Sequence, residues 1–355
     1  MEIKDFLEKP TLIDKVIEKY IPRNFSGDTV LFKVNPPRYS CNFNFLDKAI
    51  AEPLWEFLDR GGKRWRPSLF LLICEALGQN PENMKDFAII PEVIHNGTIM
   101  IDDIEDSSEL RRGRPCTYRI YGLDIAINVG NAMYYLPLLP LVESKEKFSP
   151  EKLCKIYEVY VKEMINLSLG QGMDIAWHRG LVHAGEITEK DYLQMCAYKT
   201  GTLARMAAKM AAILSDANDK LAEKLGCFAE SIGIAFQMQD DILDLTGQEF
   251  ADKKGGIGQD ITEGKRSLMV IHTLSVANSA DKKRLIEILD MRTSNQKLKE
   301  EAILIMKKYG SLKYVQQLAR KMVKENWIEV EKVLPESNAK KKLGAFAKFL
   351  IEREI

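Results

Sequence analysis

The stretch Ile94–Arg114, IHNGTIMIDDIEDSSELRRGR, joins an apolar run to a cluster of four closely spaced acidic residues. If this stretch is helical, Asp102 and Asp106 lie one turn apart on one face, and His95 lies two turns before Asp102 on that face. Two like charges about 4 Å apart repel by roughly 1 kcal/mol in water and by roughly 4 kcal/mol at an effective dielectric of about 20. Because the acids follow apolar residues, part of the cluster is expected to point inward, where a divalent cation with oxygen ligands would neutralise it.

A second acidic cluster lies far downstream in FQMQDDILDL, residues 236–245. Asp240, Asp241 and Asp244 repeat the spacing of the first cluster, and Gln237 precedes Asp240 by about one helical turn. One such cluster alone is as easily a solvated acidic helix face. Two clusters within apolar sequence instead favour a magnesium site for a phosphate ligand, because a carboxylate pair leaves coordination positions open.

Composition narrows the class of protein. Lys plus Arg and Asp plus Glu both number 51, so no net charge attracts nucleic acid or an acidic membrane. The six cysteines lack CxxC spacing, which is typical of reduced thiols. The N-terminus lacks the apolar run of a signal peptide, and no uninterrupted apolar stretch reaches the roughly 20 residues of a membrane span. We therefore expect a cytoplasmic protein without stable membrane insertion.

Helical periodicity dominates from residue 45 onward and predicts an all-α fold. Residues 151–334 contain no proline, which permits long helices, and no window of alternating β-branched residues competes. The expected organisation is an N-terminal helix and irregular arm over residues 1–44, followed by a single large helical bundle over residues 45–355. We expect the two acidic helices to face each other across a central cavity.

Prolines predict two helix boundaries. Pro91 is expected in the first turn of the helix that carries the first acidic cluster, where its missing N–H costs nothing. Pro137 and Pro140 are expected to end the next helix near Leu136.

Basic residues gather in two segments. GGKRWRP, residues 61–67, offers glycines for close backbone approach and Lys63, Arg64 and Arg66 as donors. Its place at the start of an apolar helix suits an anion such as diphosphate, although a solvated basic turn is the alternative. LRRGRP, residues 110–115, sets arginines beside the first acidic cluster, so a phosphate could lie between metal and guanidinium groups.

Two further features suit the same ligand. Gly201 interrupts a helical stretch at a cost of about 1 kcal/mol relative to alanine, and a break there would point Lys199 and Thr200 into a cavity. DKKGGIGQDITEGKR, residues 252–266, predicts a flexible loop rich in lysine.

These motifs together resemble those of the trans-isoprenyl diphosphate synthases over residues 45–275. The matching elements are GGKRWRP, DDIEDSSELRRG, KTG at residues 199–201, FQMQDDILD and EGKR. The resemblance, which is closest to geranylgeranyl diphosphate synthases, implies the all-α isoprenoid synthase fold. It also implies a prenyltransferase in which three Mg²⁺ ions hold the diphosphate of an allylic substrate.

The resemblance assigns roles to individual residues, with the six aspartates, Lys199 and Lys265 as the catalytic set. The expected metal ligands are Asp102, Asp106 and Asp240, supported by Asp103, Asp241 and Asp244. The isopentenyl diphosphate site would comprise Lys63, Arg66, His95 and Arg112. The allylic diphosphate site would comprise Arg111, Lys199, Thr200, Gln237, Lys254 and Lys265, with Lys253 as an alternative to Lys254.

The implied reaction condenses isopentenyl diphosphate with dimethylallyl, geranyl or farnesyl diphosphate. The allylic carbon–oxygen bond ionises, the isopentenyl double bond attacks, and a proton is lost, while metal and cationic side chains stabilise the leaving diphosphate. His95 is expected to bind diphosphate and not to act as the base.

Product length is expected to depend on packing beside the first acidic helix. The growing chain would pass Gly97 and Thr98, which are small enough to leave the path open. Tyr134 and Tyr135 are either a floor deeper down or ordinary core aromatics. These features favour a twenty-carbon geranylgeranyl product.

Several alternatives stay open at this point. A longer-chain polyprenyl or a farnesyl diphosphate synthase would share the same motifs. A class I terpene cyclase usually lacks a second complete DDxxD and the GGKRxRP segment, and a non-catalytic partner subunit usually loses aspartates from one cluster. The resemblance also implies a homodimer formed through helices near the first acidic cluster.

Overall fold

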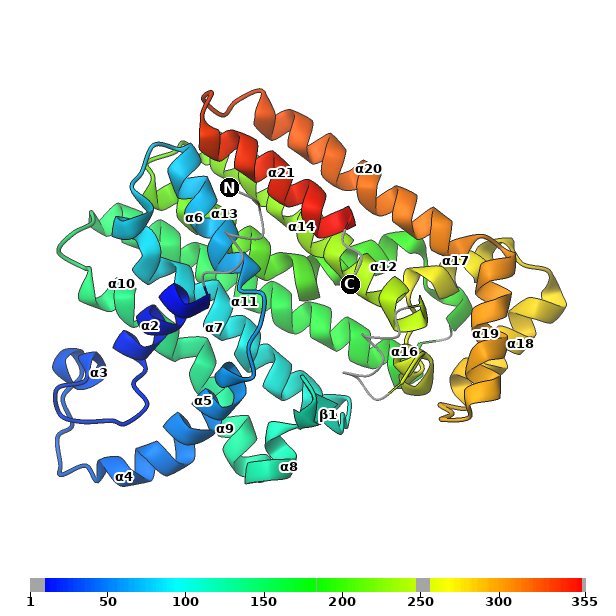
Figure 1. The fold of residues 1–355 in the computed structure, drawn as a ribbon, viewed down its shortest axis with the longest axis horizontal. Coiled ribbons are helices and arrows are strands. Elements are labelled where there is room, and N and C mark those ends of the chain that lie inside the picture. Colours follow the sequence, from blue (N-terminus) through cyan, green and yellow to red (C-terminus); the bar gives the residue numbers. More distant parts are fainter. Residues whose placement is uncertain (1–9, 183, 247–255, 353–355) are drawn as a thin grey trace. The chain divides into compact units, whose positions relative to one another are not determined.

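The computed structural model describes residues 10–182, 184–246 and 256–352, which are helical almost throughout (Figure 1). Within these ranges the only strands are β1 (Leu110–Arg111) and β2 (Arg114–Pro115), a short antiparallel pair. The predicted all-α class is confirmed.

The chain divides into two compact units. Unit 1 comprises Met1–Val161, Met206–Gly226 and Val333–Phe346. Unit 2 comprises Lys162–Arg205, Cys227–Lys332 and Ala347–Ile355. The first acidic cluster belongs to unit 1 and the second to unit 2.

The described helices follow one another along the chain. Up to residue 143 the helices are α2 (Pro10–Tyr20), α3 (Val30–Val34), α4 (Phe43–Leu46), the π-helical η1 (Asp47–Ala51), α5 (Glu52–Asp59), α6 (Trp65–Ala76), α7 (Pro81–Glu105), α8 (Thr117–Tyr121), α9 (Leu123–Tyr135), the 3₁₀ turn η2 (Leu136–Leu138) and α10 (Leu139–Glu143). Beyond it they are α11 (Pro150–His178), the 3₁₀ turn η3 (Ala184–Glu186), α12 (Glu189–Cys196), the π-helical η4 (Ala197–Gly201), α13 (Thr202–Leu214), α14 (Asp219–Thr246), α16 (Gln259–Glu263), α17 (Leu268–Val276), α18 (Ser279–Asp290), α19 (Gln296–Lys308), α20 (Ser311–Glu331) and α21 (Asn338–Glu352).

The helix that carries the first acidic cluster, α7, packs against α6 and α9. It begins at Pro81, directly after Asn80, whose side-chain oxygen accepts the N–H of Glu82 at 3.0 Å. Pro91 lies inside the helix, so its predicted place in the first turn is wrong, and Pro81 takes that role. The residues around Pro91 are buried, and their packing outweighs the backbone hydrogen bond that proline cannot donate.

The helix that follows the hairpin, α9, ends at Tyr135, and Pro137 and Pro140 lie in η2 and at the start of α10. The predicted end near Leu136 is therefore confirmed. Among the described residues, Leu123–Glu143 is long and apolar enough to cross a membrane by length and composition. However, η2 interrupts this stretch, and its first part, α9, packs on α7 within unit 1.

Unit 2 is built from the proline-free part of the chain. Its helix α12 starts with a capping box, in which Asp191 N–H donates to the Thr188 hydroxyl at 3.3 Å and Thr188 N–H donates to Asp191 Oδ2 at 2.9 Å. An aromatic pair fixes α20 against α14, because the rings of Phe228 and Trp327 lie 5.3 Å apart.

Candidate active site

The first acidic cluster lies at the C-terminal end of α7. Asp102 and Asp106 are partly exposed, and Asp106 is the C-cap residue. Asp103 is only 1% exposed, so part of the cluster points inward as predicted. A helix C-terminus already carries partial negative charge, so carboxylates gathered there require a compensating cation.

Arg111 provides part of that compensation. Its Nη2 and Nε lie 2.5 and 2.7 Å from Asp103 Oδ1, and the β1–β2 turn presents it to α7. Burial raises the pKa of Asp103, and the charge of Arg111 opposes this shift. Arg60, itself paired with Glu56 at 2.6 Å, donates to the Arg111 carbonyl at 3.2 Å. The resemblance assigned Arg111 to the allylic diphosphate, whereas its contact here is with the acidic cluster.

The GGKRWRP segment runs into α6, and Arg64 there has a left-handed backbone with φ 46°. Its buried guanidinium pairs with Glu92 at 3.1 Å and with Asp14 at 3.0 Å. The expectation that Arg64 donates to a ligand is therefore wrong, because two carboxylates within unit 1 already occupy its donors. A Cβ at Gly62 would lie 3.3 Å from Arg64 Nη1 and 3.4 Å from Arg112 Nη2, so this glycine makes room for two guanidinium groups.

Arg112 lies beside a buried polar pair that the motifs did not reveal. It donates to the Gly61 carbonyl and, at 3.1 Å, to Asn96 Oδ1. Asn96 in turn donates to Glu92 Oε1 at 3.1 Å, and both residues are almost fully buried. A signal was present in the sequence, because Glu92, Asn96 and Asp103 lie on one face of the helix among apolar residues such as Ile89, Val93 and Met100.

The pKa of His95 reflects the positive charge of the neighbouring arginines. Burial, followed by repulsion from Arg66 and Arg112, holds the pKa of His95 well below its usual value. Burial also lowers the pKa of Arg112 to about 10. Three of the four residues predicted to bind isopentenyl diphosphate therefore lie in one positively charged region, and the fourth, Lys63, is exposed on the adjoining segment. Such a region favours an anion.

We refer to these residues as the α7 site. Its members are Lys63, Arg66, His95, Asp102, Asp103, Asp106, Arg111 and Arg112.

The second acidic cluster lies near the C-terminal end of α14. Asp240 is partly exposed, whereas Asp241 and Asp244 are 7% and 1% exposed. Asp244 accepts the backbone N–H groups of Gln259 at 3.3 Å and Asp260 at 3.1 Å, where α16 begins. Asp240 is the member most open to a ligand, while Asp244 fixes the chain that follows.

Asp241 is held by two neighbours. Gln237 Nε2 and the Tyr192 hydroxyl each donate to its carboxylate at 2.8 Å. Burial, reinforced by the charge of Asp260, raises the pKa of Asp241 to about 7. A bound cation would relieve this excess of negative charge.

Lys199 and Thr200 lie in η4, so the predicted helix break at Gly201 is a π-helical turn through which the helix continues into α13. Lys199 Nζ donates to Asp174 Oδ2 at 2.6 Å, and the Thr200 hydroxyl donates to Gln237 at 3.1 Å. The two side chains thereby join α11 and α14 within unit 2. Single π-helical turns are frequent at functional sites.

Lys265 follows α16 and lies 2.7 Å from Glu263 and 3.9 Å from Asp260. Lys254 and its alternative Lys253 lie outside the described residues. The α14 site accordingly comprises Lys199, Thr200, Gln237, Asp240, Asp241, Asp244 and Lys265.

The residues predicted to control product length differ in their surroundings. A Cβ at Gly97 would lie 2.8 Å from the Gly130 carbonyl and 3.3 Å from the Tyr134 ring, so α9 fills the space beside this glycine. This packing argues against a product path past Gly97, whereas Thr98 is partly exposed on the face that carries Asp102. Tyr135 is 66% exposed, which leaves Tyr134 as the ring that packs against α7.

The donor chemistry of both sites suits magnesium. Over residues 10–182, 184–246 and 256–352, no three His, Cys, Asp or Glu side chains are placed to hold a metal ion by themselves. Magnesium usually binds one or two carboxylates together with waters and substrate phosphates, so a complete protein cage is not required. Asp102, Asp106 and Asp240 supply partly exposed oxygen donors of the right kind.

Comparison with known proteins gives consistent matches. Residues 47–306 match the profile of the polyprenyl synthetase family. The chain is 34% identical to the short chain isoprenyl diphosphate synthase of Methanothermobacter thermautotrophicus, over 83% of this chain and 87% of that protein. It is 33% identical to the geranylgeranyl diphosphate synthase of Saccharolobus solfataricus, over 86% of this chain and 91% of that protein.

Solved structures agree with these matches. The geranylgeranyl pyrophosphate synthetase of Pyrococcus horikoshii superposes with a TM-score of 0.81 at 32% identity, covering 99% of this chain and 98% of that one. A decaprenyl diphosphate synthase from Rhodobacter capsulatus gives a TM-score of 0.80 at 21% identity, covering 99% of this chain and all of the other, and supports the fold alone. The family match, which covers most of the chain and includes both acidic clusters, shows that this protein belongs to the polyprenyl synthetase family, the trans-isoprenyl diphosphate synthases.

Proposed function

We propose that this prenyltransferase is a geranylgeranyl diphosphate synthase. It would condense isopentenyl diphosphate with dimethylallyl, geranyl or farnesyl diphosphate. The observation that carries the proposal is the 33% identity to a geranylgeranyl diphosphate synthase over 86% of this chain. The family depends on Mg²⁺, and both acidic clusters retain all their aspartates.

We propose that the residues of the α7 site and those of the α14 site both act in this condensation. Asp102, Asp106 and Asp240 would hold the three Mg²⁺ ions that we expect. The positive region around His95 receives isopentenyl diphosphate, which its charge supports. Arg111, Lys199, Thr200, Gln237, Lys254 and Lys265 belong to the allylic diphosphate site.

The chemistry that follows is dissociative. Ionisation of the allylic carbon–oxygen bond moves negative charge onto the diphosphate, and Lys199 and Lys265 stabilise that charge by donating to its oxygens. Magnesium, when bound, neutralises the same diphosphate. His95 is neutral at pH 7 because its pKa is lowered, so it can hold isopentenyl diphosphate by a hydrogen bond. The isopentenyl double bond attacks the allylic carbon, and the departing diphosphate takes the proton that the new chain loses.

Product length would be set beside α7. Thr98 lies one turn before Asp102 and leaves that face open, while Tyr134 limits the space where α9 approaches α7. Mass spectrometry of the product tests this assignment, and mainly farnesyl diphosphate would refute a twenty-carbon product. Tyr134→Ala should lengthen the product, whereas Tyr135→Ala should leave it unchanged because Tyr135 is exposed.

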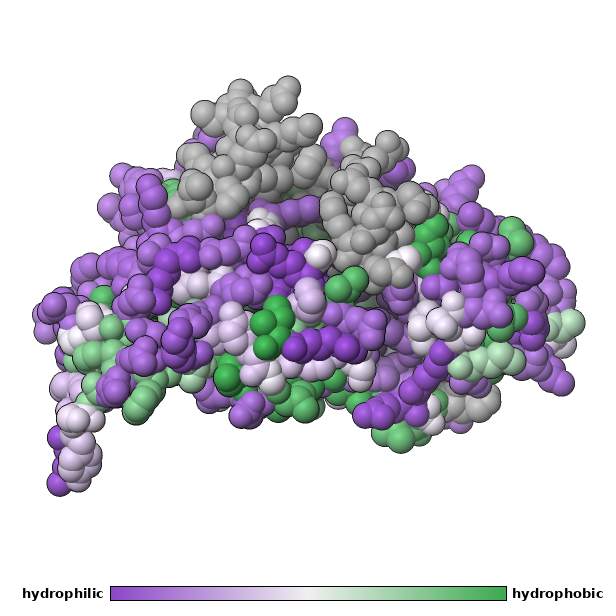
Figure 2. All heavy atoms as spheres, turned by 60° about the horizontal axis from the view of Figure 1, so that its bottom comes forward, coloured by the Kyte–Doolittle hydropathy of each residue, from purple (hydrophilic) through white to green (hydrophobic). Residues whose placement is uncertain are grey.

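We also propose a homodimer. Leu123, Ile127 and Tyr135 follow a four- or eight-residue spacing along α9 and are 54%, 43% and 66% exposed. On the face drawn in the space-filling view, several groups of apolar side chains lie among hydrophilic ones (Figure 2). Leu123→Glu combined with Ile127→Glu should give a monomer in light scattering if this face is the interface.

We propose that the protein is located in the cytoplasm. All six cysteines are free, which fits a reducing compartment. Cell fractionation would test this directly.

One assay separates the rival functions. The purified protein, incubated with Mg²⁺, isopentenyl diphosphate and farnesyl diphosphate, should release diphosphate and form geranylgeranyl diphosphate. A class I terpene cyclase would release diphosphate from an allylic substrate without isopentenyl diphosphate, and a non-catalytic partner subunit would do neither.

A further inference from the structure

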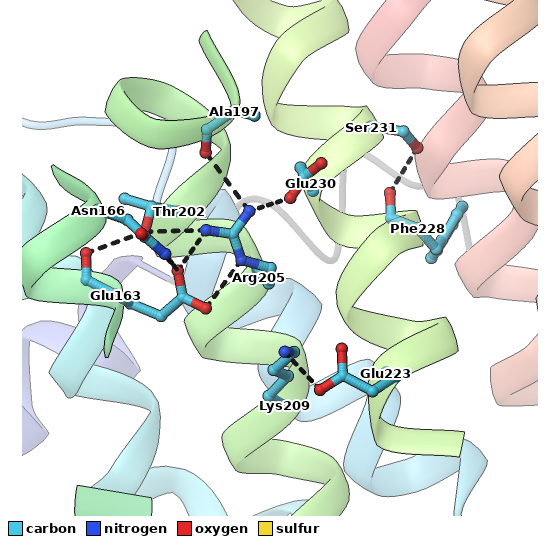
Figure 3. A network of polar contacts seen from close by, with 10 residues as sticks. All are labelled: Glu163, Asn166, Ala197, Thr202, Arg205, Lys209, Glu223, Phe228, Glu230 and Ser231. Atoms are coloured by element: carbon cyan, nitrogen blue, oxygen red, sulfur yellow. Dashed lines mark hydrogen bonds and ion pairs between the residues drawn. The ribbon is translucent and has the colours of Figure 1, made fainter. Parts of the chain in front are cut away.

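Outside every motif described so far, unit 2 contains a buried charged network centred on Arg205 (Figure 3). Arg205 Nε and Nη2 donate to the two oxygens of Glu163 at 2.8 and 2.5 Å, and Arg205 Nη1 also pairs with Glu230. Arg205 is 9% exposed and Glu163 is 3% exposed. Burying one guanidinium between two carboxylates is costly unless the arrangement is fully hydrogen-bonded. Such a network is therefore expected to have a structural or functional role.

The network holds both ends of the π-helical turn η4. Arg205 Nη1 donates to the carbonyl of Ala197, the first residue of the turn, at 3.5 Å. Thr202, the residue directly after the turn, donates its hydroxyl to Glu163 Oε2 at 2.5 Å. The residues that carry diphosphate-binding side chains, Lys199 and Thr200, lie between these two attachments.

Two glycines allow the neighbouring helices α11 and α14 to pack closely against the same turn. A Cβ at Gly170 on α11 would overlap the backbone of Lys199. A Cβ at Gly233 on α14 would lie 2.8 Å from Gly201 Cα and 3.1 Å from the Thr200 carbonyl. The turn is therefore in direct backbone contact with both helices, and a change in its winding cannot be absorbed by side-chain movement alone.

A π-helical turn contains one residue more than the α-helical turn it replaces. If the turn relaxed to α-helix, the residues on one side of it would rotate by about 100° relative to those on the other. Lys199 would then lose its contact with Asp174, and Thr200 would lose its contact with Gln237. Loss of Arg205 would remove its contact with the Ala197 carbonyl and would leave Glu163 without its guanidinium partner, so less would hold the wider turn.

We propose that Arg205, together with Glu163 and Glu230, is a positioning residue that maintains the π-helical turn and so aims Lys199 and Thr200 at the allylic diphosphate. This inference rests on the proposed function. Arg205 does not touch substrate and acts through the turn. Its loss should weaken use of the allylic substrate and leave use of isopentenyl diphosphate unchanged, since the residues assigned to isopentenyl diphosphate belong to unit 1.

The test measures KM for each substrate separately in Arg205→Met, Arg205→Lys and Glu163→Gln. Arg205→Met should raise the KM for farnesyl diphosphate by about tenfold or more, because misplacing Lys199 weakens a charged hydrogen bond to the diphosphate. The KM for isopentenyl diphosphate should stay within about twofold. Arg205→Lys retains the charge and should recover part of the loss. An equal change in both KM values, or none, would overturn the inference.

Unit 1 offers a matched control on the same two helices. Lys209 on α13 lies 2.7 Å from Glu223 on α14, and this pair, in which Glu223 is exposed and Lys209 partly exposed, does not touch η4 (Figure 3). Lys209→Met and Glu223→Gln should leave both KM values unchanged, because an exposed ion pair contributes little. If these variants reproduce the selective allylic defect, the effect belongs to the helix pair in general and the inference fails.

A double-mutant cycle separates positioning from loss of stability. If Arg205 acts through the turn, combining Arg205→Lys with Thr200→Val should raise the allylic KM by less than the product of the single effects. Independent, multiplicative effects would overturn the inference. Where Arg205→Met does not fold, Arg205→Lys and Glu230→Gln give the same readout. Failure of the wild-type protein to condense the two substrates would refute the proposed function itself, whereas an active wild type with unselective Arg205 variants would refute only this inference.

Discussion

The α7 site and the α14 site carry opposite electrostatic imbalances. At the α7 site, burial and the charges of Arg66 and Arg112 lower the pKa of His95. At the α14 site, burial and the charge of Asp260 raise the pKa of Asp241 to about 7. The first site has a local excess of positive charge beside His95, and the second has an excess of negative charge beside Asp241. This difference predicts that the region around His95 accepts diphosphate without metal, whereas the α14 site needs a cation first.

The two sites also differ in how they are assembled. The acidic cluster and Arg111 and Arg112 at the α7 site come from one short stretch of chain, so α7 and the following hairpin suffice to bring them together. The α14 site instead joins α11, η4, α14 and α16, and its contacts cross between segments distant in sequence. We expect the α14 site to be more sensitive to changes in helix packing.

The largest expected effect comes from removing a carboxylate that is proposed to bind Mg²⁺ at either site. Asp102→Ala and Asp240→Ala should each lower kcat by about 10³-fold or more, because charge on the leaving diphosphate would no longer be neutralised. Both variants should retain the helical circular dichroism of the wild type. Substantial turnover in either variant, measured by diphosphate release, would contradict the proposed role of that aspartate as a metal ligand.

Removing the half-buried guanidinium of Arg112 at the α7 site should act on one substrate only. Arg112→Gln should raise the KM for isopentenyl diphosphate by roughly 10–150-fold, which corresponds to the loss of about 1.5–3 kcal/mol from a charged hydrogen bond. Arg114 lies on the same hairpin with its side chain 64% exposed, so Arg114→Gln serves as the control and should change KM little. A larger effect on the allylic substrate would reverse the assignment of the two sites.

Magnesium dependence should respond to pH through Asp241. Its raised pKa means that the metal-free protein holds a proton there below about pH 7, and a metal must displace that proton. The Mg²⁺ concentration for half-maximal activity should therefore rise as pH falls from 8 to 6, by at most about tenfold per pH unit for one proton. Asp241→Asn should remove this slope, and a wild-type profile that is flat in pH would exclude Asp241 as the titrating group.

The smallest expected effect concerns His95. Whereas Mg²⁺ binding should weaken as pH falls, isopentenyl diphosphate binding at His95 should strengthen. Diphosphate beside His95 should raise its lowered pKa, so isopentenyl diphosphate binding takes up protons and strengthens as pH falls. Isothermal titration calorimetry without Mg²⁺ should measure this at pH 7.5 and 6.0. Between these two pH values the affinity for isopentenyl diphosphate should increase about threefold more in the wild type than in His95→Gln. The variant serves as the control for ionisation of the diphosphate itself. If the affinities of wild type and His95→Gln changed in parallel with pH, His95 would not belong to the isopentenyl diphosphate site.

Much of the α7 site was predictable because its residues are close in sequence. Helical spacing alone put Asp102 and Asp106 on one face and turned part of the cluster inward. The buried partner Glu92 and its contact with Arg64 were not predictable from motifs, because a basic turn gives no sign of which guanidinium is already paired. The predicted place of Pro91 in a first turn is wrong for a related reason, since burial around it outweighs the local preference of proline for a first turn.

The sequence by itself determined the helical class, the chemistry of the donors and the family, because these depend on periodicity, residue type and the order of motifs. Tertiary structure alone decided which charges are paired within the protein, that the interruption at Gly201 is a π-helical turn, and that α9 fills the space beside Gly97. The physical reason is that pairing, burial and close packing depend on contacts between segments far apart in the chain, which local pattern does not encode.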